Sequence, residues 1–217
     1  NINSIHKLNM KKHLKEVYGF NNFRHKQKNI ICDLIKKKNI IAILPTGGGK
    51  SLLYQYPATF TNKITIVVSP LISLMNDQCR HLNLKNIKAV SLNSETFVPV
   101  NEYKNYKIIY TTPEFIMSRM PAFNLIKDKI GLFAIDEAHC VSQWSHDFRT
   151  SYQNLGMLKT KFPDIPMLAV TATATPNVLK EMKTFLLIRW MQTNHKIFKP
   201  LHKNIHKVIV MINFQKQ

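Results

Sequence analysis

Acidic residues are scarce in this sequence. It holds 12 Asp and Glu against 31 Lys and Arg among 217 residues, which gives a formal net charge of +19. Such an excess excludes an acidic surface and favours a polyanionic partner, either a nucleic acid or an acidic membrane surface. Because AT-rich coding DNA also enriches Lys, Asn and Ile, the charge alone does not define a function.

Cysteines and long apolar runs are also scarce. Cys32, Cys79 and Cys140 lie too far apart for a zinc-binding Cys-x-x-Cys pair or a disulfide framework, so we expect a reduced, intracellular setting and no structural zinc. No apolar run approaches the roughly 20 residues that cross a bilayer. Residues 1–12 are polar and basic and lack the apolar segment of a secretory signal. We therefore expect no membrane partner and an intracellular location, in the nucleus if the source is eukaryotic.

Short apolar runs bounded by turn residues recur along the chain. They cover residues 40–44, 64–68, 107–110, 132–135 and 167–170, with a weaker sixth at 87–90. These runs are almost wholly apolar rather than alternating, which is typical of strands buried on both faces of a parallel sheet. Stretches with helical spacing, such as 5–18 and 23–38, supply the crossovers. The sequence predicts one α/β domain with helices on both faces of a parallel sheet.

The last thirty residues differ from the rest. Residues 188–217 are rich in Lys, His and Asn, with one apolar run at 208–212. Three interpretations are open for this segment: a linker, an extra strand, or the start of a second domain.

A glycine-rich turn follows the first apolar run. The sequence Pro45-Thr-Gly-Gly-Gly-Lys-Ser51 leads from a strand into a helical stretch at 52–60, which is the order of a phosphate-binding loop. Glycines let backbone N–H groups point inward, and the helix N-terminus favours anions. The pattern predicts ATP bound with Mg²⁺, although Leu44 stands where the general pattern has Gly. The expected ligands are the loop residues Thr46, Gly47, Gly48 and Gly49, Lys50 on the β- and γ-phosphates, and Ser51 on Mg²⁺.

Two carboxylates follow another apolar run. Residues 132–135 lead into Asp136-Glu-Ala-His139, and ligands bind at the carboxyl ends of strands in open α/β sheets. Asp136 is expected to hold Mg²⁺, and Glu137 to act as general base on the attacking water. An Asp-Glu pair alone also suits a helix N-cap, and the phosphate loop is what favours the catalytic interpretation. The predicted catalytic residues are Lys50, Asp136 and Glu137.

Together these motifs resemble superfamily 2 helicases with a DEAH box. Further segments resemble the RecQ branch of that superfamily, in the family's order, over about residues 5–187: they are 18–27, 69–78, 111–114, 140–149 and 169–176. The resemblance implies a RecA-like P-loop NTPase domain over residues 1–187. Within it, residues 1–38 would form N-terminal helices that carry an adenine-recognition motif.

The resemblance also implies roles for individual residues. The Gln27 amide can pair with an adenine edge, and Arg24 and Phe20 offer planar faces to a base. Nucleic-acid binding, or its coupling to ATP hydrolysis, would involve Ser69, Thr112, His139, Trp144, His146, Phe148, Arg149, Thr171 and Thr173. Other interpretations are open: a helix start over a buried Phe23 for the adenine segment, N-capping for Ser69 and Thr112, and core packing for the aromatic residues.

The sequence departs from the RecQ pattern in three respects. Ser145 stands where a Gly is usual, Arg149 is followed by Thr-Ser-Tyr rather than Pro-Glu-Tyr, and no second motor domain with arginine fingers follows. We therefore expect the first motor domain of an ATP-dependent 3′–5′ DNA helicase, which couples ATP hydrolysis to translocation and unwinding in DNA repair or recombination. Its expected partners are single-stranded and partly duplex DNA and the missing second RecA-like domain. The alternatives are a DEAH-box RNA helicase and a truncated nucleic-acid-binding module without unwinding activity.

Overall fold

A parallel β-sheet forms the centre of the molecule. The computed structural model describes residues 2–24, 26–188 and 207–210. The strands are Ile40–Ile43 (β1), Ile64–Val68 (β2), Ala89–Leu92 (β3), Ile108–Thr111 (β4), Ile130–Ile135 (β5), Met167–Thr171 (β6) and Lys207–Val210 (β7). Their order is β3-β4-β2-β5-β6-β1-β7, and every pairing is parallel. The expected parallel sheet is confirmed.

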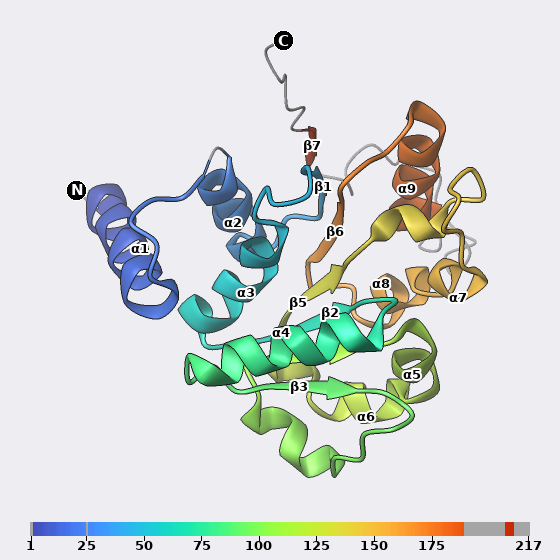
Figure 1. Cartoon of the computed structure of the whole chain (residues 1–217), viewed down its shortest axis with the longest axis horizontal. Coiled ribbons are helices and arrows are strands. Elements are labelled where there is room, and N and C mark those ends of the chain that lie inside the picture. The colour runs from blue at the N-terminus through green and yellow to red at the C-terminus, as the bar shows by residue number, and fades with distance from the viewer. Residues whose placement is uncertain (1, 25, 189–206, 211–217) are drawn as a thin grey trace.

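Helices fill the crossovers between the strands. The first four, α1 to α4, are Ile2–Tyr18, Gln27–Ile35, Lys50–Thr61 and Ile72–Leu84. The others, α5 to α9, are Pro113–Ser118, Met120–Leu125, Thr150–Gln153, Gly156–Lys161 and Pro176–Ile188. Short 3₁₀ turns lie at Val100–Asn105, Lys127–Lys129 and Ala138–Val141. In Figure 1, α1 to α3 lie together at one side of the molecule, in blue to cyan. In the part of the chain that the structure describes, no helix is long and apolar enough to span a membrane.

The two faces of the sheet bury two separate apolar clusters. In β1, Ile40 and Ala42 join side chains of α1 to α4, while Ile41 and Ile43 join those of α5 to α9. Successive strand residues point to opposite faces, so a strand covered on both faces must be apolar throughout. This explains why the apolar runs do not alternate, and it confirms the helices on both faces.

Segment 188–217 is described only in part. Residues 207–210 form β7, which pairs with β1 at the edge of the sheet. Residues 189–206 and 211–217 lie outside the described residues. All three interpretations of this segment, a linker, an extra strand and the start of a second domain, therefore stay open. The domain boundary near residue 187 also stays a prediction.

The carboxyl ends of the parallel strands meet at one edge of the sheet. On one side of this edge lie the loop 45–51 after β1, Asp136 and Glu137 after β5, and residues 172–175 after β6; we call this the β1 half. On the other side lie residues 69–71 after β2, 93–99 after β3 and 112–119 after β4; we call this the β4 half. Most of the site residues expected from the sequence lie along this edge.

Candidate functional site

The phosphate loop has a backbone that requires glycine. Gly47 and Gly49 have φ angles of 76° and 80°, a left-handed region that side chains with a Cβ rarely adopt. The Gly48 N–H donates to the Pro45 carbonyl oxygen at 2.8 Å, which closes the turn. Thr46 is exposed. Helix α3 begins directly afterwards at Lys50, so its N-terminal N–H groups face the space that the loop encloses.

Residues 18–27, the segment in which we expect adenine recognition, are hydrogen-bonded to this loop. The buried Gln27 accepts a hydrogen bond from the Arg24 backbone N–H at 2.7 Å, and its Nε2 donates to the Gly49 carbonyl oxygen at 3.1 Å. Arg24 Nη1 donates to the Gly47 carbonyl oxygen at 3.2 Å. Phe20 is exposed, with the Lys85 ammonium 5.8 Å from its ring centroid. The structure thus brings Arg24 and Gln27 to the phosphate loop, and places Phe20 on the surface.

Asp136 lies at the end of β5 and is almost fully buried, with 7% of its surface exposed. Its Oδ1 accepts the Glu137 N–H at 2.9 Å, and its Oδ2 accepts the hydroxyl of Tyr54 at 3.4 Å. Burial raises the pKa of Asp136, and the neighbouring Glu137 charge raises it further, while Lys50 acts in the opposite direction. The carboxylate is therefore held in a setting that a nearby cation would stabilise.

Glu137 has a strained backbone, with φ at 47°. A left-handed conformation costs a residue with a Cβ about 1 kcal/mol or more. This backbone conformation places the Glu137 carboxylate between Lys50 and His139. Lys50 Nζ lies 3.4 Å from Oε1, and His139 Nδ1 lies 3.3 Å from Oε2. Helix α3 and the end of β5, 87 residues apart in sequence, thus meet at the proposed general base.

His139 joins three segments of the edge. Its Nδ1 lies 2.7 Å from Thr171 Oγ1, and its Nε2 lies 3.3 Å from Asp147 Oδ2. The Thr171 hydroxyl, at the end of β6, donates to the Thr173 carbonyl oxygen at 3.1 Å. One imidazole therefore contacts the Glu137 carboxylate, the end of β6 at Thr171 and Asp147 in the aromatic-rich loop.

The aromatic-rich loop, residues 140–149, is largely exposed from Gln143 onward. Trp144 exposes 67% of its surface, His146 is exposed and Phe148 is half-buried. Core packing, the alternative interpretation of this loop, therefore does not describe Trp144. Arg149 Nη1 donates to the Pro70 carbonyl oxygen at 3.2 Å, so the loop reaches from the β1 half toward the β4 half.

Ser69 and Thr112 are less available than the sequence suggests. Ser69 is buried, and its hydroxyl finds no hydrogen-bond partner in the described part of the chain. Thr112 Oγ1 accepts the Phe115 N–H at 3.2 Å and so caps α5. The N-cap interpretation therefore fits Thr112, and contact of either hydroxyl with a nucleic acid stays a prediction.

The comparisons with known proteins agree with this geometry. The family model for DEAD/DEAH box helicases matches residues 24–182, a segment that includes the phosphate loop, Asp136-Glu-Ala-His139 and the strand after them. The chain belongs to the DEAD/DEAH box helicase family. The helicase assignment made from the motifs is thereby confirmed.

Within this family the chain is similar to RecQ-type DNA helicases. It is 43% identical over 188 residues to ATP-dependent DNA helicase Q-like 4B of Arabidopsis thaliana, covering 80% of this chain and 16% of that protein. It is 42% identical over 179 residues to the probable ATP-dependent DNA helicase RecS of Bacillus subtilis, covering 80% and 36%. It is 40% identical over 205 residues to ATP-dependent DNA helicase RecQ of Haemophilus influenzae, covering 90% and 30%. The resemblance to RecQ helicases is confirmed, and the chain spans about a third or less of these relatives.

Solved helicase structures share the fold. The helicase domain of Hef from Pyrococcus furiosus superposes with a TM-score of 0.62 at 18% identity, over 87% of this chain and 38% of that one. The DUF1998 helicase MrfA bound to DNA superposes with a TM-score of 0.69 at 18% identity, over 93% and 29%. The expected RecA-like α/β fold is confirmed.

Two tyrosines in this DEAD/DEAH box helicase domain were not predicted as site residues. Tyr54, fully buried on α3, donates to Asp136. Burial, and then the Asp136 charge, raise the pKa of Tyr54 well above its ordinary value, and a smaller contribution from Ser51 acts in the opposite direction. Tyr152 donates to the Asp136 carbonyl oxygen at 3.0 Å. Tyr54 lies one helical turn after Lys50 and Ser51, and that spacing is the signal that could have identified it.

A buried amide connects the two halves of the edge. Gln55, next to Tyr54 on α3, donates to Gln78 Oε1 on α4 at 3.0 Å and to the Tyr110 hydroxyl on β4 at 3.1 Å. Gln78 lies on α4, which follows residues 69–71 of the β4 half, and Tyr110 lies on β4, which leads into residues 112–119 of the same half. A shift of α3 against β4 would therefore disturb this amide.

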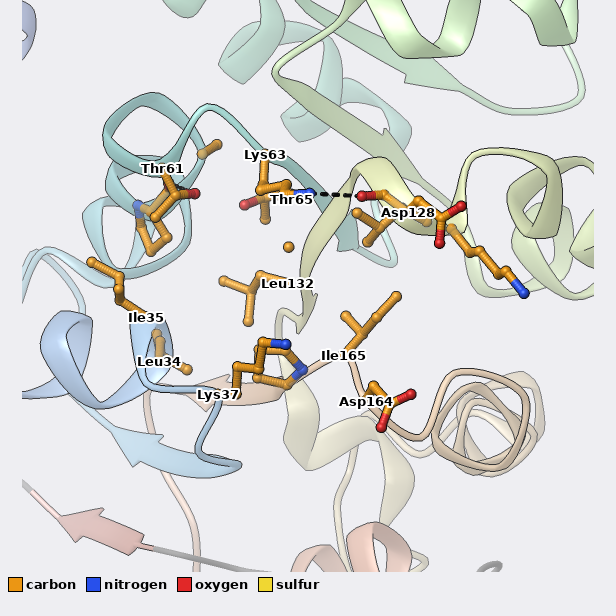
Figure 2. Close-up of a pocket in the computed structure, with 16 residues that line it drawn as sticks. Leu34, Ile35, Lys37, Thr61, Lys63, Thr65, Asp128, Leu132, Asp164 and Ile165 are labelled. Atoms are coloured by element: carbon orange, nitrogen blue, oxygen red, sulfur yellow. Dashed lines mark hydrogen bonds between the residues drawn. The ribbon is translucent and has the colours of Figure 1, made fainter.

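A hollow lies away from all of these residues. Figure 2 shows this cavity of about 320 Å³ between Leu34, Lys37, Lys63, Leu132 and Ile165, with Lys63 donating to the Asp128 carbonyl oxygen at 2.7 Å. It lies at the amino ends of β2, β5 and β6, opposite the phosphate loop. None of the site residues predicted from the sequence lines this hollow.

Proposed function

We propose that the chain is the first motor domain of an ATP-dependent 3′–5′ DNA helicase of RecQ type. It would act inside the cell, in the nucleus if the source is eukaryotic, and couple ATP hydrolysis to movement along single-stranded DNA and to unwinding in repair or recombination. The observation that carries this proposal is the position of Glu137 between Lys50 and His139, because His139 also contacts the aromatic-rich loop. One carboxylate is thereby connected both to a phosphate-binding lysine and to a loop suited to DNA.

Nucleotide binding would rearrange the lysine. Lys50 is paired with Glu137 at 3.4 Å. The β- and γ-phosphates of ATP carry more charge than one carboxylate, so they would attract the Lys50 ammonium and release Glu137 for a water molecule. Gln27 and Arg24, already held against the phosphate loop, would place the adenine ring beside it, with Phe20 as a further planar face.

Two residues, one at the start of α3 and one after β5, fit a magnesium ion. The Ser51 hydroxyl and the Asp136 carboxylate are oxygen ligands, which Mg²⁺ prefers, and magnesium is often held by one or two protein groups together with substrate phosphates. Tyr54 bonds to both residues and so fixes their relative positions. A bound Mg²⁺ would neutralise charge on the phosphates.

Glu137 is the proposed general base. Its carboxylate would accept a proton from a water molecule as the water oxygen attacks the γ-phosphorus and the bond to the bridging oxygen breaks, leaving ADP and phosphate. Once the phosphates have drawn Lys50 away, the backbone of Glu137 and its contact with His139 would still orient this carboxylate. DNA bound at the aromatic-rich loop would alter that orientation through the Asp147–His139 contact.

The chain alone is expected to be slow. An arginine finger stabilises the transition state of phosphoryl transfer by about 10³–10⁵ in rate, and in two-domain helicases it comes from the second motor domain. We therefore expect weak ATP binding, slow hydrolysis and no unwinding by these 217 residues. ATP-dependent strand displacement by the chain alone would contradict this part of the proposal.

The test compares single-stranded DNA with RNA. We expect Mg·ATP turnover by the chain to rise more with single-stranded DNA than with RNA of the same sequence. Equal or greater stimulation by RNA would favour a DEAH-box RNA helicase. No ATP binding at all, with intact binding of nucleic acid, would favour a binding module and overturn the proposed function.

A further inference from the structure

A second hollow lies in the β4 half of the edge and contains none of the site residues predicted from the sequence. Its volume is about 480 Å³, within the range of about 300–1,000 Å³ that is usual for ligand pockets. The segment after β3 and the helix after β4 form its walls. The lining residues that matter below are Glu95, Phe97, Phe115, Ser118 and Arg119.

The side chains of this hollow suit a flat ligand. Phe97 exposes 87% of its surface, which leaves a large aromatic ring in water without a packing role. Arg119 is also exposed, and its guanidinium carbon lies 5.9 Å from the Phe115 ring centroid. Aromatic rings and guanidinium planes are the two side-chain groups on which unpaired bases stack.

The hollow lies on the course that a bound strand would follow. The aromatic-rich loop touches Pro70 after β2 through Arg149, and the order β5-β2-β4-β3 places the ends of β4 and β3 next. Adjacent strands are about 4.8 Å apart, so the course from β5 to β3 spans about 14 Å. A nucleic-acid strand rising 3.4 Å per nucleotide covers that span with about four nucleotides.

The charges in the hollow favour a base over a phosphate. Glu95 lines the hollow together with Arg119, and a carboxylate repels a phosphate group. The same carboxylate accepts hydrogen bonds from the exocyclic amino groups of bases. The net charge of +19 attracts the backbone of the strand to the protein as a whole.

We propose that this hollow holds one unstacked base of single-stranded DNA against the ring of Phe97, with Arg119 beside it. The inference rests on the proposed function, since it extends the DNA path of the motor domain by a subsite beyond the aromatic-rich loop. The hollow would anchor one end of the bound strand.

The experiment moves a single abasic site along a 12-nucleotide single-stranded DNA. Affinity for the full chain is measured by fluorescence anisotropy at fixed salt, because binding to the phosphates depends on salt. With the unmodified chain, we expect a marked loss of affinity at one position near an end of the contacted segment. Phe97→Ala should weaken binding of the intact strand by about tenfold, within the range for loss of one base–aromatic stack, and should abolish the effect of the abasic site at that position only.

Three variants complete the test. Phe97→Trp should restore the position-specific effect, because tryptophan also stacks on bases. Arg119→Gln should reduce that effect. Leu84→Ala removes an equally exposed apolar side chain, 77% exposed, at the far end of α4, and should leave the profile unchanged.

The outcomes separate the two proposals. If the chain binds single-stranded DNA but Phe97→Ala leaves the abasic-site profile unchanged, or lowers affinity equally at every position, the inference about the hollow is overturned and the proposed function stands. If the chain binds no single-stranded DNA, both are overturned.

Discussion

The two halves of the sheet edge differ in the side chains that they present. In the β1 half polar side chains are bonded to other groups of the same half: Gln27 to the phosphate loop, Lys50 to Glu137, Tyr54 to Asp136 and His139 to Thr171. In the β4 half the prominent side chains, such as Phe97, Arg119 and Leu71, are exposed. The proposed ligands would account for this difference. A nucleotide in a catalytic geometry needs groups held in place beforehand, whereas a strand of any sequence needs stacking faces and positive charge.

The two halves are joined by the pairing of β2 with β5 and by contacts of side chains. The aromatic-rich loop contacts His139 on one side and Pro70 on the other, and the Gln55 amide joins α3 to α4 and β4. Variants of either half should therefore change one function strongly, and variants of the joining residues should change how the functions depend on each other.

The largest effect is expected from Glu137→Gln in the β1 half. The amide keeps the shape of the carboxylate but does not accept the proton from water, so the rate of ATP hydrolysis should fall by about 10²–10⁴. The affinity for single-stranded DNA should stay within about twofold, because Glu137 lies outside the loop and the hollow that are proposed to contact DNA. Steady-state phosphate release and anisotropy on the same preparation measure both. An equal loss of both functions would refute the division into two halves.

A smaller effect is expected from Trp144→Ala in the aromatic-rich loop. Loss of one stacking ring should weaken single-stranded DNA binding by about tenfold and lower the stimulation of hydrolysis by DNA. Turnover without DNA should change little, because the Trp144 side chain is 67% exposed and lies outside the contacts around Glu137. Turnover as a function of DNA concentration separates the two quantities. If the dependence of turnover on DNA concentration is unchanged, the aromatic-rich loop does not join the two halves.

Tyr54→Phe tests how firmly the β1 half is built. The hydrogen bond to Asp136 is lost at a buried site, and such a bond contributes about 1 kcal/mol, so the Mg²⁺ concentration for half-maximal turnover should rise about fivefold. Tyr56→Phe is the matched control, because that buried hydroxyl on the same helix donates to the Met10 carbonyl oxygen at 2.8 Å. Both changes should lower the melting temperature, and only Tyr54→Phe should alter the Mg²⁺ dependence. The same shift in both variants would contradict a specific role for Tyr54.

Gln55→Leu tests the connection between the halves. Leucine has a similar volume and cannot bond to Gln78 or Tyr110, so we expect DNA to change the affinity for ATP about threefold less than in the unmodified chain, within the usual size of coupling effects. ATP affinity measured with and without saturating DNA gives this ratio. An unchanged ratio would leave the aromatic-rich loop as the joining element.

The smallest effect concerns the packing of α1 on α3 beneath the β1 half. Burial lowers the pKa of His13 below 6.5, partly offset by Glu16, and its ring bonds to Thr59 at 2.9 Å. Below that pH the unfolded chain binds more protons than the folded chain, so the free energy of unfolding falls as the pH drops through 6.5 toward the lowered pKa. His13→Gln should flatten this dependence. His81→Gln, at an exposed position on α4, should not.

The features that could be predicted from the sequence are those formed by residues adjacent in the chain. The strands, the phosphate loop and Asp136-Glu-Ala-His139 are contiguous, so their chemistry is visible in the order of the residues. The contacts Gln27–Gly49 and Tyr54–Asp136 join residues 22 and 82 apart, and strand order and register decide which distant residues meet. The hollow beside Phe97 could not be predicted from the sequence, because it forms only when β3 lies beside β4. An isolated Phe in a polar stretch of sequence also shows no recognisable pattern. The burial of Ser69 likewise depends on tertiary packing.

The measurement that tests the central claim most directly is Mg·ATP turnover by the chain, with and without single-stranded DNA, beside Glu137→Gln. We predict slow turnover that rises with DNA and vanishes in the variant, since His139 connects Glu137 to the aromatic-rich loop. The central claim is that the β1 half hydrolyses ATP in response to DNA bound at the β4 half. If turnover persists in Glu137→Gln, or if DNA does not change it, this claim is contradicted.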